Sequence, residues 1–75
     1  MDMDKEVLLC TAARLYSLGI EVEAARNRLR VLIKKGTSPK SKKVRNAMRE
    51  FKELDMQWKI LEAQYIEERN KMLSE

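Results

Sequence analysis

Apolar residues recur every three or four positions along two stretches of this 75-residue chain. This spacing places side chains on one face of an α-helix, and it predicts helices over about residues 4–35 and about residues 39–73. The two series, apolar except at Thr11 and Glu68, are Leu8, Thr11, Leu15, Leu18, Val22, Ala25, Leu29 and Leu32, and Val44, Ala47, Phe51, Leu54, Trp58, Leu61, Tyr65, Glu68 and Met72. We call these positions the seam and expect the helices to pack through it.

The segment from Lys35 to Pro39 separates the two series. Gly36 suits the C′ position that ends a helix, and Ser38 before Pro39 suits an N-cap followed by the first helical turn. A turn over residues 36–38 is short, so it makes the helices antiparallel neighbours. The sequence therefore predicts an all-α fold in which residues 1–75 form one domain, an antiparallel, coiled-coil-like two-helix hairpin.

Folding the chain about Gly36 and Thr37 predicts which seam residues face one another across the hairpin. The expected pairs are Leu29 with Val44, Val22 with Phe51, Leu15 with Trp58, and Leu8 with Tyr65. Gly19 leaves an alternative open, because a glycine there is compatible with a bend or with a break that would produce three helices. The seam spacing passes Gly19 without a slip, which favours two helices.

Each predicted helix also carries apolar residues outside the seam, which we call the apolar flanks. They are Leu9, Ala13, Tyr16, Ile20, Ala24 and Val31 in the first helix, and Met56, Ile60, Ala63, Ile66 and Leu73 in the second. A single hairpin would leave these surfaces in water, so we expect a homodimer that pairs about a two-fold axis into a four-helix bundle. The alternatives are a helix from a different protein, or a wide core closed by a bend at Gly19.

The composition strengthens the expectation of a partner. A chain of this length builds only a small core, and its one cysteine and lack of histidine exclude an internal disulfide framework and the usual zinc sites. No apolar run approaches the roughly 18 residues that span a membrane, and the amino terminus is acidic where a signal peptide is basic. We therefore expect a cytoplasmic protein with no membrane partner.

The net charge of +4 is distributed unevenly along the chain. Residues 26–52 hold eleven basic and one acidic side chain, whereas residues 1–25 and residues 53–75 each carry a net charge of −3. In a hairpin the first and last segments lie together, so one end of the rod is acidic and the turn is strongly basic. We call the following cations the basic tip: Arg26, Arg30, Lys34, Lys35, Lys40, Lys42, Lys43, Arg45 and Arg49.

The basic tip suits several anionic partners. We expect it to engage an acidic protein or a ribonucleoprotein, and the alternative is RNA or DNA, whose phosphates attract Lys and Arg whatever the base sequence. No aromatic residue lies between Arg26 and Arg49 to stack on a base, so such binding would be sequence-tolerant. The tip could also face the acidic end of a second copy, or simply be a solvated surface.

The residues that enzymes commonly use are missing from the pattern. Without histidine, neither a cysteine–histidine nor a serine–histidine pair can form, and Gly19 and Gly36 stand alone rather than in a phosphate-binding loop. We therefore expect no catalysis, no cofactor, no metal and no small-molecule substrate.

The predicted architecture is similar to small helical-hairpin dimers that bind RNA, in shape alone and with no shared motif. The sequence thus favours a small assembly or adaptor protein.

Overall fold

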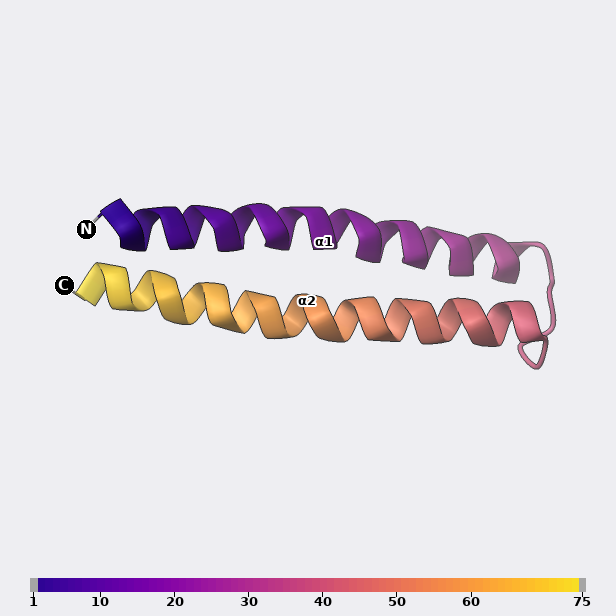
Figure 1. Cartoon of the computed structure of the whole chain (residues 1–75). Helices are drawn as coiled ribbons and strands as arrows, with labels where there is room; N and C mark the ends of the chain where they lie inside the picture. The colour runs from indigo at the N-terminus through magenta and orange to yellow at the C-terminus, as the bar shows by residue number, and fades with distance from the viewer. Residues whose placement is uncertain (1, 75) are drawn as a thin grey trace.

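The computed structural model describes the backbone of residues 2–74 and the side chains of residues 5–74. Helix α1 spans Asp2–Lys34 and helix α2 spans Lys42–Ser74, each with 33 residues. They run antiparallel, side by side along their whole length, and form a rod of 53 × 14 × 14 Å (Figure 1). The predicted all-α hairpin is confirmed, and because α1 continues through Gly19 the three-helix alternative is wrong.

The seam is the core of the hairpin. Every seam position is buried or half-buried, and the most enclosed is Ala25, with 1% of its surface exposed. The hydroxyl of Thr11 is buried as well, and it donates a hydrogen bond to the carbonyl oxygen of Val7 at 3.0 Å, so it is satisfied within α1. Most of the larger seam side chains remain half-buried, which is the thin core expected where only two helices meet.

Helix α1 ends at Lys34, and Gly36 occupies the predicted C′ position. The glycine adopts a positive φ of 77°, and the amides of Gly36 and Thr37 donate to the carbonyls of Ile33 and Leu32 at 3.0 and 3.1 Å. These are the two hydrogen bonds of a Schellman motif, which satisfies carbonyls that the helix end would otherwise leave open.

Helix α2 begins later than predicted, at Lys42 rather than at Pro39. Ser38 does not cap it, because its carbonyl accepts from the amide of Ser41 at 2.9 Å and so closes a separate turn over residues 38–41. Ser41 is the N-cap instead, since its Oγ accepts from the amide of Val44 at 3.3 Å. The connection is therefore residues 35–41, longer than the predicted turn.

The longer connection changes which residues face one another. Trp58 lies against Gly19, and Phe51 lies beneath Arg26, whereas the predicted partners were Leu15 and Val22. Both contacts lie about four residues along α1 from the predicted partners, although Leu15 still lines one hollow together with Trp58. The two helices now begin and end at the same heights, which places the middle of α1 opposite the middle of α2 (Figure 1).

Candidate binding surfaces

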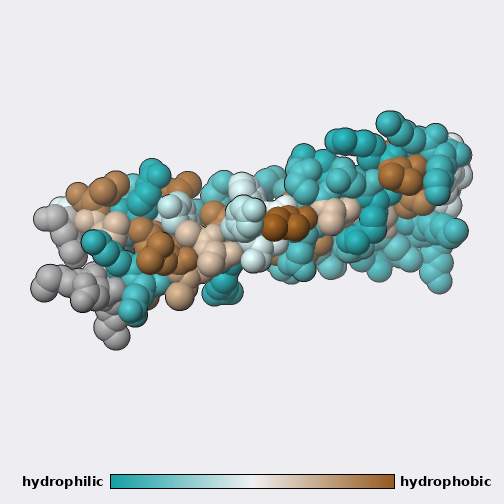
Figure 2. All heavy atoms as spheres, turned by 90° about the horizontal axis from the view of Figure 1, so that it is seen from above, coloured by the Kyte–Doolittle hydropathy of each residue, from teal (hydrophilic) through white to brown (hydrophobic). Residues whose placement is uncertain are grey.

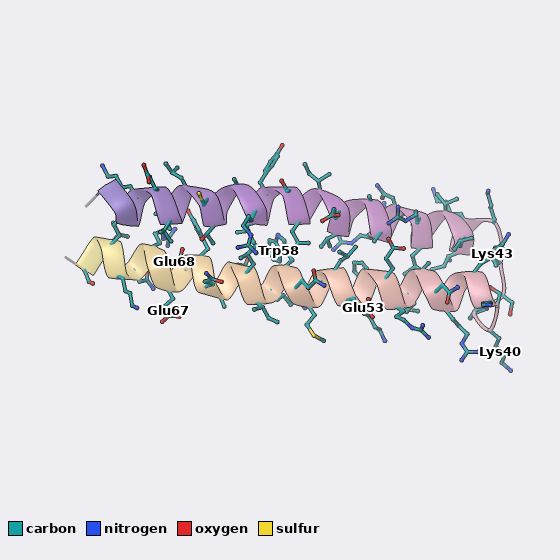
Figure 3. All side chains as sticks on the ribbon, in the orientation of Figure 1. Lys40, Lys43, Glu53, Trp58, Glu67 and Glu68 are labelled. Carbon is teal, nitrogen blue, oxygen red and sulfur yellow. The ribbon has the colours of Figure 1, made fainter. Side chains whose placement is uncertain are left out.

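The side chains of the basic tip lie on the surface of the rod. All nine of its side chains are solvent-accessible, and they surround the loop end of the rod, where Figure 3 shows Lys40 and Lys43 extending from the loop and the first turn of α2. The first turn of α2 holds Lys42, Lys43 and Arg45 and contains no acidic residue. Since the amino end of a helix carries a partial positive charge, these cations repel both one another and the helix dipole.

Ion pairs within the hairpin neutralise little of this charge. Across the helices, Arg28 pairs with Glu50, and along α1 Arg26 donates to Glu23 at 2.9 Å. The guanidinium of Arg26 also lies 5.6 Å from the ring centroid of Phe51, a cation–π geometry. Of the nine tip residues, only Arg26 has a carboxylate partner among the described side chains. Arg26 is thus engaged within the hairpin, whereas the other eight tip cations are exposed to solvent.

The apolar flanks are exposed, as predicted. Tyr16 is 74% exposed and Ile20 is 56% exposed, and Met56 and Ile60 are also open to water. Figure 2, which looks onto α1 from above, shows brown apolar patches over the half away from the tip and mostly teal, hydrophilic atoms around the tip. Because most residues of each flank lie on the side of the helix away from its seam, the two flanks face largely away from each other. They are therefore two surfaces rather than one continuous interface.

One side of the rod is hollowed where α1 and α2 meet. This depression, which we call the central groove, has a volume of about 610 Å³. Its lining is almost entirely apolar and consists of Ala12, Leu15, Tyr16, Gly19, Ile20, Glu23, Trp58 and Tyr65. Two flank residues of α1 thus share a surface with seam aromatics of α2, an arrangement that depends on how the two helices lie against each other.

Gly19 shapes the floor of the central groove. A Cβ atom at this position would lie 3.3 Å from Nε1 of Trp58 and 3.8 Å from its Cδ1, which is tighter than ordinary packing. The indole therefore lies directly on the backbone of α1, between the two helices (Figure 3). A glycine inside a helix costs about 1 kcal/mol relative to alanine, and here that cost allows the close approach of Trp58.

The groove is bounded toward the tip by charged pairs. A smaller hollow of about 290 Å³ continues past Trp58 and is lined by Gly19, Val22, Glu23, Arg26, Asp55 and Trp58. Its rim carries the Arg26–Glu23 pair and a second pair in which Lys59 lies 3.0 Å from Asp55. The apolar middle of the rod is thus separated from the basic tip by a short band of mixed charge.

The sequence predicts that the tip and flank residues are exposed, but it does not predict the groove. Ala12, Gly19, Trp58 and Tyr65 were assigned to structure alone or not assigned at all, because the predicted register did not bring Gly19 to Trp58. The sequence features that could have indicated the groove were a single glycine within the first predicted helix and the only tryptophan within the second. It becomes interpretable only once the length of the loop is known.

Within residues 2–74, neither helix has a stretch that is apolar enough and long enough to cross a membrane. No cluster of three cysteine, aspartate or glutamate side chains forms among the described residues at which a metal ion would be held.

Comparisons with known proteins add no relative from which a role could be transferred: no family model matches the chain, and neither a curated protein nor a solved structure does.

Proposed function

We propose that this chain is a non-enzymatic binding or assembly protein whose basic tip engages an acidic protein or a ribonucleoprotein. The observation that carries the proposal is the set of eight exposed tip cations that lack a carboxylate partner among the described side chains. The proposal keeps the cytoplasmic setting expected from the single cysteine, Cys10, which lies exposed as a free thiol on α1.

The tip is energetically suited to an external anion. Lys42, Lys43 and Arg45 crowd the positive end of α2, so an approaching carboxylate or phosphate relieves repulsion among the cations as well as forming new ion pairs. Charges of this kind raise the association rate and select partners by sign more than they add affinity. We expect the exposed apolar residues of the rod to supply the additional binding energy.

Nucleic acid is the second candidate, and the spacing of cations on α2 favours it. Lys42, Arg45, Arg49 and Lys52 follow one another at steps of three or four residues, and all are exposed. They form a line of positive charge about 15 Å long at about 1.5 Å per residue. Phe51 is the nearest aromatic, and Arg26 covers it, so a base would have no free ring to stack on. Such binding would follow the phosphates alone.

We also propose that the chain forms a homodimer, a four-helix bundle in which two hairpins share apolar surface. The exposure of Tyr16 and Ile20 on one side of α1 supports this proposal, since large apolar side chains gathered on a surface often mark an interaction site.

The test of the tip compares binding of a polyglutamate peptide and of mixed RNA at low and moderate salt. The tip variant is the triple substitution Lys40→Glu, Lys42→Glu and Lys43→Glu, and the matched control is Lys5→Glu, Arg69→Glu and Lys71→Glu at the open end of the rod. Both change the net charge by the same amount at exposed positions. We expect the tip variant to lose salt-sensitive binding and the control to retain most of it.

The outcomes separate the candidates. Binding of polyglutamate but not RNA supports an acidic protein partner, and RNA binding that the tip variant loses, with a salt slope about 2 smaller, supports the nucleic-acid candidate. Equal losses in the two variants would show that only net charge matters. Absence of binding to both probes at low salt would overturn the role of the tip.

A further inference from the structure

The central groove lies at the middle of the rod. Trp58 is the seventeenth of the 33 residues of α2, and Gly19 is the eighteenth of the 33 residues of α1. The residues that line the groove on α1 extend from Ala12 to Glu23, on both sides of that midpoint. If two copies of the rod lie antiparallel and overlap fully, residues at the midpoint of one copy lie beside the same residues of the other copy.

The position of the groove along the rod matters because a two-fold axis relates the two copies of a homodimer. When two identical rods lie antiparallel and overlap along their full length, the two-fold axis passes through their midpoints. A patch at the midpoint then contacts itself, so Tyr16, Gly19 and Trp58 of one copy meet the same residues of the other. We propose that the central groove is this contact, and that two copies of the chain associate antiparallel about an axis at Gly19 and Trp58. This inference rests on the proposed self-association and specifies its surface and orientation.

The surface available on one side of the rod is sufficient for a stable contact. The hairpin exposes 6225 Å² of accessible surface in all, of which one side of the rod is roughly a quarter. Stable interfaces bury about 800 Å² on each partner, so a contact centred on the groove reaches that size within one side of the rod.

The charge distribution selects the antiparallel orientation over the parallel one. Residues 26–52 carry a net charge of +10, and the rest of the chain carries five basic and eleven acidic residues, a net charge of −6. A parallel pair would place the two tips together, at +20 in one end of the bundle. The antiparallel pair places each tip beside an acidic end, which leaves +4 at both ends. The remaining cations are still available to an anionic partner.

The first test is the association constant measured by sedimentation, together with the fluorescence of Trp58. The variant Tyr16→Asp puts a charge into the groove, and the two-fold axis puts it there twice, so we expect the dissociation constant to rise on the order of a hundredfold. The control Ser17→Asp introduces the same charge at the neighbouring exposed position outside the groove, and we expect a change of less than about threefold. Emission from Trp58, the only tryptophan, should shift to shorter wavelength as the wild type associates.

The second test measures orientation with spin labels in a Cys10→Ser background. A label at Lys34→Cys lies sixteen residues from the midpoint of α1, or about 24 Å at about 1.5 Å per residue. Antiparallel copies therefore place the two labels about 48 Å apart, whereas parallel copies place them within about 20 Å, the width of two helices. A label at Ser17→Cys, beside the midpoint, should give a short distance in either orientation.

Each result decides the proposal. Long distances at Lys34→Cys with short ones at Ser17→Cys support it, and short distances at both sites overturn the antiparallel arrangement. A wild type that sediments as a monomer at all concentrations, or equal weakening by Tyr16→Asp and Ser17→Asp, overturns the groove as the contact. None of these measurements involves an anionic ligand, so the inference fails or stands separately from the function proposed for the tip.

Discussion

The basic tip and the central groove lie on the same two helices but present opposite kinds of surface. Around the tip the seam is flanked by exposed cations, and the only nearby aromatic, Phe51, is covered by Arg26. At the groove the seam opens, and Trp58 and Tyr65 lie beside the exposed Tyr16 and Ile20. The seam residues beneath the two regions follow one spacing, so packing alone does not distinguish them.

The fold of this chain and the character of its exposed surfaces are therefore largely independent. The seam holds the helices together wherever it runs, whereas the residues outside it differ between the halves in charge and in polarity. Substitutions in the seam should therefore act on stability in either half, and substitutions outside it should act mainly on association. Three substitutions test this division between the seam and the surface, and the largest change in stability is expected for the first.

Leu61→Ala should produce the largest loss of stability. Leu61 is 8% exposed and lies in the seam between Trp58 and Tyr65, so the substitution leaves a cavity that costs roughly 2–4 kcal/mol. A two-helix core has little stability to spare, and we expect much of the helical circular dichroism to be lost in mild urea. The control is Leu73→Ala on the α2 flank, where Leu73 is 70% exposed and the change should stay within about 0.5 kcal/mol. Equal losses at the two positions would contradict the division between seam and surface.

Glu68→Leu should stabilise the hairpin. Glu68 occupies a seam position near the open end, and Figure 3 shows it directed toward α1 while Glu67 points away. Its Oε1 accepts a hydrogen bond from Nε2 of Gln64 at 3.0 Å, but its Oε2 is buried without a hydrogen-bond partner among the described residues. Removing that unsatisfied oxygen should raise the free energy of unfolding by roughly 1–3 kcal/mol.

The matched control for Glu68 is its neighbour. Glu67→Leu removes the same charge from an exposed position, and we expect the urea midpoint to move little. If Glu68→Leu lowered the midpoint, the carboxylate would have to make a stabilising contact in solution, and the seam would be partly polar at its open end.

The seam could be predicted from sequence because helical periodicity is a local property. Steps of three and four residues place Leu15 and Val22, or Leu54 and Leu61, on one face whatever the other helix does, and all the seam positions are buried or half-buried as expected. The exposure of the tip and flanks followed from the same geometry, since residues off the seam of a two-helix rod have nothing to cover them.

The register and the groove could not be predicted because they depend on the loop. Two serines, Ser38 and Ser41, both suit an N-cap, and Pro39 favours the first; the turn closed by the Ser38 carbonyl instead delays the helix to Lys42. With α2 beginning at Lys42, Trp58 lies against Gly19, a contact that the predicted turn did not provide. The contact of Arg26 with Phe51 is likewise one that the predicted turn did not provide, and through it one predicted tip residue is engaged within the hairpin.

Lys42→Glu should have the smallest effect on stability, and its sign is informative. Lys42 is the first residue of α2, next to the Ser41 cap, where a carboxylate interacts favourably with the helix dipole and a cation does not. We expect the free energy of unfolding to rise by about 0.3–1 kcal/mol at low salt, while binding to an anionic probe weakens.

Lys52→Glu provides the comparison, because it makes the same charge change at an exposed position in the interior of α2, away from the helix end. There the dipole contributes little, so we expect a smaller change in stability. If Lys42→Glu raises the free energy of unfolding and weakens binding to the probe, Lys42 destabilises the hairpin and contributes to a contact outside the chain. A loss of stability would instead mean that the tip cations support the hairpin itself, and the principal argument for an external partner at the tip would fail.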